Sequence, residues 1–339
     1  MKAVKSLLGA MRVFSASLVV SSSTAGIVAQ IPGPDGRWDY ASFDSAGHRI
    51  LISKSYGVMA LDLSTRKLST VAPGTHVNAS TALPNGRILI TNEDVRTVTL
   101  ANGSSGAIES TITVGKDPDA AVFDPASGNA FVMNNGSGDI SVIDIDKGVE
   151  KRRVPVGGAL EFAAVDGAGK LFVNVEDKAE VAVLDTRTLA LGGHYKLAGC
   201  KEPSGLAYVA SVHLLVSSCG NGHAKIIDAK DGHEVGDVSI GPRPDAVLYD
   251  SARSRIYIPT GGSYELNGEL TVLSVGTDGK VALAGRIPTQ RGARTIAQDP
   301  ETGLLYLPTA DYVKGLRGPK AVDGTFRILI VSPDLDAPK

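Results

Sequence analysis

The stretch PDAAVFDPASGNAFVMNNGSGDISVIDIDKGVEKRRVPVGG (118–158) decides the fold of this chain. It contains four short apolar runs, at 118–125, 130–134, 140–145 and 151–157, separated by polar turns rich in Gly, Asn and Asp. The third run alternates apolar and polar residues, as a half-buried strand does. Four strands joined by tight turns within about 40 residues are typical of one blade of a β-propeller.

The same unit recurs along the chain. A residue near the start of each first run, polar in every copy, marks the repeat, and successive markers lie 39 to 49 residues apart: Asp39, Asn78, Asp119, Glu161, Ser204, Asp245 and Arg294. Second strands such as RILIS (49–53), KLFVN (170–174) and LLYLP (304–308) follow at matching distances. Seven such units predict an all-β, seven-bladed β-propeller.

The two ends of the chain predict how the ring closes. The last unit has a third strand, FRILIVS (326–332), but no fourth strand after it. The segment GIVAQIPGPDG (26–36) resembles fourth strands of other units, for example LAGRIPTQRG (283–292). We therefore expect the N-terminal strand to complete the last blade, which leaves no free sheet edge, and we assign 26–339 to one propeller domain.

Residues 1–25 have the order of features typical of a secretory signal peptide. Lys2, Lys5 and Arg12 precede or flank a short apolar run at 13–20, and small residues follow as far as Ala25. A disordered tail and an extra helix are the alternatives. Cleavage after Ala25 keeps the closing strand, whereas cleavage after Ala29 removes most of it, so we predict the former. The run is too short to span a bilayer, and the sequence predicts a periplasmic or secreted protein without a membrane span.

Several segments resemble one known family. NAFVMNNGSGDISVIDIDKGVEKRRVPVGG (129–158) resembles the YVTN-type repeat of the YncE-like bacterial β-propellers. The segments at 157–186, 200–208 and 287–310 are similar to an exported subgroup of that family. The resemblance implies a seven-bladed propeller and an extracytoplasmic location. It implies no reaction, because one fold serves many functions.

The repeat-marking residues define the first candidate site. In a propeller the first strand of each blade lines the central channel, so these residues should form a ring at the channel mouth. Like charges placed close together must be protonated, hydrated or paired with a cation. Oxygen ligands suit Ca²⁺ or Mg²⁺, and the metal ligands predicted here are Asp39, Asp119, Glu161 and Asp245. The alternative is that each polar residue only caps a local turn.

A second set of residues departs from the repeat on the same face. Its members are His76, Glu176, Asp177, Tyr264, Arg291 and Tyr312. Separately from this set, Asn92, Asn134 and Asn174 in loops next to the ring could add carbonyl ligands to a metal there. Residues that break a repeat without serving its fold are candidates for function. We predict ligand contacts from Asn78, Asn174, Glu176, Arg291 and the charged ring members. His76, Glu161 and Arg294 are the candidates for a catalytic role.

The two cysteines fall in one unit. Cys200 lies in the turn that enters the fifth unit, and Cys219 follows the second strand of that unit. Both should lie on the same face, so an oxidising compartment favours a disulfide. A pair of free thiols that ligates copper is the alternative.

These observations leave two classes of function open. The first is an exported binding or scaffold propeller, a monomer whose ligand or periplasmic partner meets the channel mouth. The second is a hydrolase or lyase of lactonase-like layout, assisted by Ca²⁺ or Mg²⁺ on the central carboxylates. A net charge of −2 and 5% aromatic residues do not favour nucleic-acid binding. The insertion at 310–325 is either a flap over the channel mouth or a surface loop.

Overall fold

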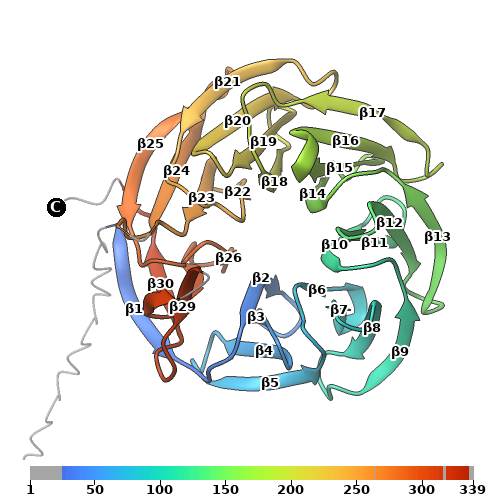
Figure 1. Ribbon diagram of the computed structural model, residues 1–339, viewed down its shortest axis with the longest axis horizontal. Helices are drawn as coiled ribbons and strands as arrows, with labels where there is room; N and C mark the ends of the chain where they lie inside the picture. Colours follow the sequence, from blue (N-terminus) through green and yellow to red (C-terminus); the bar gives the residue numbers. More distant parts are fainter. Residues whose placement is uncertain (1–24, 264, 316–317, 336–339) are drawn as a thin grey trace, which may run out of the picture.

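The computed structural model describes residues 25–263, 265–315 and 318–335. Seven four-stranded antiparallel sheets stand around a central axis, and the first strand of each sheet is nearest that axis (Figure 1). This confirms the all-β, seven-bladed propeller. Except for Ala25, the predicted signal peptide at 1–25 lies outside the described residues.

The first four blades follow one another directly along the chain. Their strands, from the axis outward, are β2 (Trp38–Asp44), β3 (Arg49–Lys54), β4 (Gly57–Asp62) and β5 (Leu68–Pro73) in blade 1; β6 (Ser80–Ala82), β7 (Arg87–Asn92), β8 (Thr97–Asn102) and β9 (Ile108–Thr113) in blade 2; β10 (Pro118–Asp124), β11 (Asn129–Asn134), β12 (Asp139–Asp144) and β13 (Val149–Pro155) in blade 3; β14 (Leu160–Val165), β15 (Lys170–Val175), β16 (Glu180–Asp185) and β17 (Leu191–Lys196) in blade 4. Two short 3-10 turns lie in loops between strands: η1 (Pro84–Gly86) between β6 and β7, and η2 (Glu176–Lys178) between β15 and β16.

The last three blades include the closure and an added hairpin. Their strands are β18 (Pro203–Val209), β19 (Leu214–Cys219), β20 (His223–Asp228) and β21 (Glu234–Ser239) in blade 5; β22 (Leu248–Asp250), β23 (Arg255–Thr260), β24 (Glu269–Val275) and β25 (Val281–Pro288) in blade 6; β26 (Ala297–Gln298), β27 (Leu305–Thr309), β30 (Arg327–Ser332) and β1 (Gly26–Pro32) in blade 7. The hairpin of β28 (Tyr312–Gly315) and β29 (Gly318–Ala321) arises from the insertion between β27 and β30.

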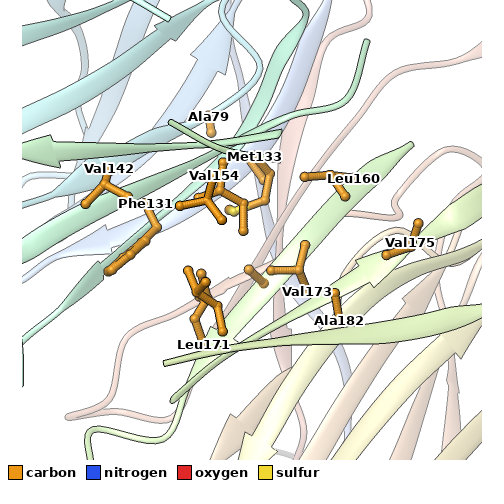
Figure 2. Close-up of a cluster of buried hydrophobic side chains, with 14 of the residues drawn as sticks. Ala79, Phe131, Met133, Val142, Val154, Leu160, Leu171, Val173, Val175 and Ala182 are labelled. Atoms are coloured by element: carbon orange, nitrogen blue, oxygen red, sulfur yellow. The ribbon is translucent and has the colours of Figure 1, made fainter. Parts of the chain in front are cut away.

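The core lies between neighbouring blades. One buried cluster joins blades 3 and 4, where Phe131 and Met133 of β11 pack with Leu171 and Val173 of β15 (Figure 2). The middle strands are buried on both faces because each sheet lies between two others, whereas the outermost strands alternate between half-buried and exposed residues. Apolar residues therefore run almost continuously along second strands and alternate along fourth strands.

The N-terminal strand closes the ring as the sequence predicted. β1 pairs with β30 in antiparallel register from Gly26 opposite Ser332 to Pro32 opposite Arg327. Ile31 and Ala29 of β1 pack against the cluster shared by blades 7 and 1. Cleavage of a signal peptide after Ala25 would leave this whole strand in place.

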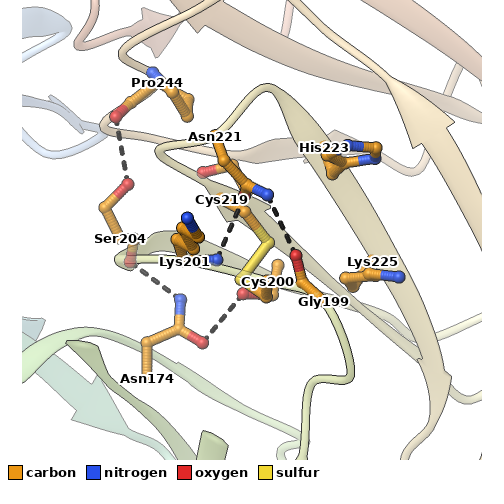
Figure 3. The surroundings of a disulfide bond; sticks show 12 residues. Asn174, Gly199, Cys200, Lys201, Ser204, Cys219, Asn221, His223, Lys225 and Pro244 are labelled. Atoms are coloured by element: carbon orange, nitrogen blue, oxygen red, sulfur yellow. Dashed lines mark hydrogen bonds between the residues drawn. A yellow bond between two sulfur atoms is a disulfide. The ribbon is translucent and has the colours of Figure 1, made fainter. Parts of the chain in front are cut away.

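The predicted disulfide between Cys200 and Cys219 is present (Figure 3). It joins the turn that enters blade 5 to the end of β19, and both cysteines are buried among apolar side chains of blades 4 and 5. The described part of the chain contains no helix that is long and apolar enough to cross a membrane.

Candidate functional site

The ring of repeat-marking residues surrounds a cavity at the channel mouth. This central cavity has a volume of about 320 Å³, and its lining includes the ring members Asp39, Asp119, Glu161, Ser204, Asp245 and Arg294. Asn78, the ring member from blade 2, is buried outside the lining, and its Oδ1 accepts a hydrogen bond from Arg37, which does line the cavity. The structure thus brings together six of the seven predicted ring members.

Irregular strand pairing turns the ring side chains toward the axis. In blades 1, 3, 4 and 5 the register between the first two strands shifts at the ring residue, for example between Trp38 and Ala41 and between Pro118 and Ala120. Such a bulge releases a residue from the ladder and redirects its side chain. The same local device, repeated around the axis, therefore builds the cavity.

Further charged residues complete the lining. The acidic residues of the lining are Asp39, Asp119, Glu161, Glu176, Glu202 and Asp245, and the basic residues are Arg37, Arg243 and Arg294. Of the described members of the second set, only Glu176 reaches this cavity, from η2. Arg37, Glu202 and Arg243 were not predicted, although each precedes a ring member by two residues, and that column of the repeat could have indicated them.

The charges are not evenly paired around the central cavity. Arg294 Nε lies 3.1 Å from Asp245 Oδ2, and Arg37 Nη2 lies 3.3 Å from Asp39 Oδ2. By contrast, none of the carboxyl groups on the side of blades 3 to 5 has an ion-pair partner among the described residues; these groups are Asp119, Glu161, Glu176 and Glu202. One side of the cavity is therefore acidic without ion pairs, although Arg37 acts at longer range to lower the pKa of Asp119.

Burial and mutual repulsion raise the pKa values of these carboxyl groups. Desolvation, followed by the neighbouring Asp119, raises the pKa of Glu161 to about 10. Desolvation and then Asp245 raise the pKa of Asp39 to about 7, against the opposing effects of Arg294 and Arg37. Desolvation and then Asp39 hold the pKa of Asp119 well above its usual range. The site thus favours either bound protons or a bound cation.

Tyr40 forms part of the cavity wall and has an unusual environment. Its side chain is 6% exposed, its ring packs on Phe162 with centroids 5.1 Å apart, and its pKa is raised first by burial and then by the four ring carboxyl groups. Its hydroxyl group has no hydrogen-bond partner within the described part of the chain. The equivalent residues in most other blades are small, such as Ala79, Ala120 and Ala246, so this departure from the repeat could have been found in the sequence.

Other predicted residues have structural partners outside the central cavity. Asn174 Nδ2 donates to the carbonyl oxygens of Ser204 and Gly205, at 2.9 and 3.0 Å, and ties blade 4 to blade 5 (Figure 3). Asn92 donates to Thr99 within blade 2, and Asn134 donates to Asp139 and Ser141 within blade 3. Asp177 accepts a hydrogen bond from the Ala159 amide.

The other residues predicted from the sequence lie near blades 1, 2 and 7 or fall outside the described residues. His76 lies outside the cavity lining, with Nδ1 2.9 Å from Asp94 Oδ1 and Nε2 in contact with Arg37 Nη1. Arg291 is also outside the lining, and its carbonyl oxygen accepts a hydrogen bond from Thr309. Tyr312 lies on β28 beside Trp38. Tyr264 falls outside the described residues.

The raised pKa values predict an unusual dependence of stability on pH. Glu161 binds its proton more tightly in the folded chain than in the unfolded chain. Its stabilising contribution is therefore complete below about pH 4 and is lost as pH rises toward 10. We expect Glu161→Gln to stabilise the protein relative to wild type by about 1–3 kcal/mol at pH 9, and by progressively less as pH falls to 5.

Urea unfolding of both proteins between pH 5 and 9 measures this difference. Glu109→Gln, on the exposed face of β9, is the matched control and should follow wild type at every pH. A difference between Glu161→Gln and wild type that stays constant with pH would contradict the raised pKa.

Comparisons with known proteins support the fold. No protein-family model matches the sequence, and no curated protein is significantly similar to it. Among solved structures, a chain of the mitotic checkpoint complex is 12% identical, with a TM-score of 0.75 over 97% of this chain and 98% of that chain. A chain of Kuenenia stuttgartiensis hydrazine synthase is 17% identical, with a TM-score of 0.69 over 93% of this chain and 99% of that chain. At these identities the similarity shows that the chain has a β-propeller fold.

Proposed function

We propose that this chain is an exported, YncE-like β-propeller that binds a small molecule or a periplasmic partner through its channel-mouth face, with a cationic group of the ligand in the central cavity. The observation that carries the proposal is the uncompensated acidic side of that cavity, formed by Asp119, Glu161, Glu176 and Glu202. The disulfide is compatible with an oxidising compartment.

The ligand-free site is energetically unfavourable, because its carboxyl groups are desolvated and repel one another. Desolvated carboxyl groups that repel one another are costly unless they are protonated or paired. A cationic ligand supplies the missing charge and so binds to the folded chain more tightly than to the unfolded chain. Glu161 is the central contact in this proposal, because its only hydrogen-bonded side-chain partner among the described residues is the neutral amide of Asn135, at 2.9 Å.

The second candidate is a metal-assisted hydrolase or lyase with Ca²⁺ or Mg²⁺ on the central carboxylates. Hard oxygen donors from Asp39, Asp119, Glu161 and Asp245 suit these ions, which would polarise a carbonyl group or acidify a bound water. However, within the described part of the chain, the groups of three acidic or histidine side chains that are close enough for a common ion are His76 with Glu93 and Asp94, and Asp228 with Asp231 and His233. The described cavity carboxylates are spaced too widely to form such a group, which favours a larger cation.

Ligand-dependent thermal unfolding tests both candidates. The mature, metal-stripped protein is melted with Ca²⁺, with Mg²⁺ and with a panel of small amines, amino acids and lactones. A ligand at 100 times its Kd should stabilise the fold by about 2.7 kcal/mol, and this effect should disappear in Glu161→Gln but persist in Glu109→Gln. A stabilising divalent ion together with turnover of a lactone would favour the enzyme. An absence of any stabilising compound, or equal stabilisation of Glu161→Gln, would contradict a binding site in the central cavity.

A further inference from the structure

A second cavity adjoins the central cavity on the side of blades 7 and 1. This side cavity has a volume of about 370 Å³, and Arg37 and Arg294 line both cavities. Its aromatic wall consists of Trp38, Tyr312 and Phe326. The two cavities are therefore neighbours that share a boundary of two guanidinium groups.

The aromatic wall is held in place by packing. The ring of Trp38 lies edge-on to Phe326 at a centroid distance of 4.9 Å and to Tyr312 at 6.5 Å. The fully buried Lys54 places its ammonium group 3.6 Å from the Phe326 ring centroid and donates to the carbonyl oxygens of Pro34 and Gly36. Lys54 thus fixes the chain that leads into Arg37 and Trp38.

The charges differ between the two cavities, and this difference sets an orientation for a ligand. The central cavity has six carboxyl groups against three guanidinium groups. The side cavity is lined by Arg37, Arg294 and Lys320 against Asp35 and Asp323, and Lys54 stands behind its aromatic wall. An ammonium group is therefore favoured in the central cavity, and an uncharged ring is favoured beside Trp38 and Tyr312.

Tyr40 is an independent indication that the central cavity receives a polar organic group. Only 6% of the surface of Tyr40 is exposed. Its hydroxyl group has no hydrogen-bond partner among the residues that the structure describes. It lines the central cavity among the ring carboxyl groups. The hydroxyl oxygen is not fully buried, so it is free to form a hydrogen bond with a polar molecule bound in this cavity.

We propose that the ligand is an aromatic amine, with its ammonium group among the carboxyl groups of the central cavity and its ring in the side cavity against Trp38 and Tyr312. This inference rests on the proposed function, because it names the ligand class of the same site. The ring and the charge are both required. The charge alone reaches only the central cavity, and the ring alone leaves the acidic side uncompensated.

Isothermal titration calorimetry on the mature chain with four probes tests the inference. Phenethylamine has both features, ethylamine lacks the ring, 2-phenylethanol lacks the charge, and 3-phenylpropanoate reverses the charge. We expect phenethylamine to bind at least about tenfold more tightly than each of the others, which corresponds to about 1.4 kcal/mol.

Variants separate the two parts of the site. Glu161→Gln should weaken both amines, and Tyr312→Ala should weaken phenethylamine while leaving ethylamine unchanged. Tyr312→Phe keeps the ring and should retain the affinity of wild type, and unchanged ethylamine binding by Tyr312→Ala shows that this variant is folded. Glu109→Gln is the matched control for the charge and should bind like wild type.

Different results exclude the aromatic amine and the central cavity as a binding site. If ethylamine or a divalent ion binds as tightly as phenethylamine and Glu161→Gln abolishes that binding, the aromatic amine is excluded while the central cavity remains a binding site. Preferential binding of 3-phenylpropanoate or 2-phenylethanol also overturns the aromatic amine. If neither the four probes nor the panel of the preceding section binds, both proposals fail.

Discussion

A chain that begins at Gly33, and therefore lacks β1, is expected to lose most of its folding stability. β1 supplies the outer strand of blade 7 and pairs with β30 from Gly26 to Pro32. Its removal exposes the edge of β30 and uncovers part of the cluster against which Ile31 packs. Lost ladder hydrogen bonds at about 1 kcal/mol each and lost apolar burial together cost on the order of 5 kcal/mol, a large share of the stability of a typical domain.

Urea unfolding and light scattering of chains that begin at Gly26 and at Gly33 measure this effect. The chain from Gly26 is the control and should unfold cooperatively as a monomer. The shorter chain should aggregate or unfold at much lower urea, and a synthetic peptide of residues 26–36 should restore part of its stability by adding the missing strand. Equal midpoints for the two chains would show that β1 contributes nothing to closure.

Replacing both cysteines, Cys200→Ser with Cys219→Ser, is expected to lower the free energy of unfolding by about 3 kcal/mol, because the bridge closes a loop of about 20 residues in the unfolded chain. The bridge also holds the blade 5 wall of the central cavity. Glu202 and Gly220 line that cavity, and the Gly220 amide donates to the carbonyl oxygens of Lys201 and Glu202 beside the disulfide. We therefore expect weaker binding of any ligand that the cavity accepts.

Two measurements separate these effects. Urea unfolding of the double variant and of the reduced wild-type chain should give similar losses of stability. Affinity for the best-binding compound of the panel should fall under conditions where the variant is still folded. The single variant Ser211→Ala, in the turn after β18 of the same blade, is a control that should keep both the disulfide and the affinity. A double variant as stable as wild type would contradict the role of the bridge.

The ring of residues at the channel mouth is the part of the site that could be predicted from the sequence. Asp39, Asp119 and Asp245 were found because a repeat places equivalent residues at equivalent places around an axis. The second set was less informative, because a residue such as Asp177 breaks the repeat pattern for a local structural reason: its carboxylate accepts a hydrogen bond from the Ala159 amide. A departure from a repeat therefore indicates either a ligand contact or a local structural contact, and the sequence alone does not distinguish them.

The aromatic side cavity was not predicted. It combines Trp38 at the start of β2, Tyr312 in the insertion and Phe326 before β30. These residues come from both ends of the chain and meet only because β1 closes the ring, so no local pattern in the sequence brings them together.

The sequence by itself determined the number of blades, the strand that closes them, the cysteine pair and the ring of polar residues, because each follows from a repeat of about 40 residues, from positions within one repeat, or from a unit left incomplete. Only the tertiary structure decided how the charges pair. It placed Arg37 beside Asp39 and Arg294 beside Asp245, and it gave Asp119 and Glu161 no ion-pair partner among the described residues. The physical reason is that charge pairing and desolvation depend on distances across the axis, between blades that lie far apart in the sequence.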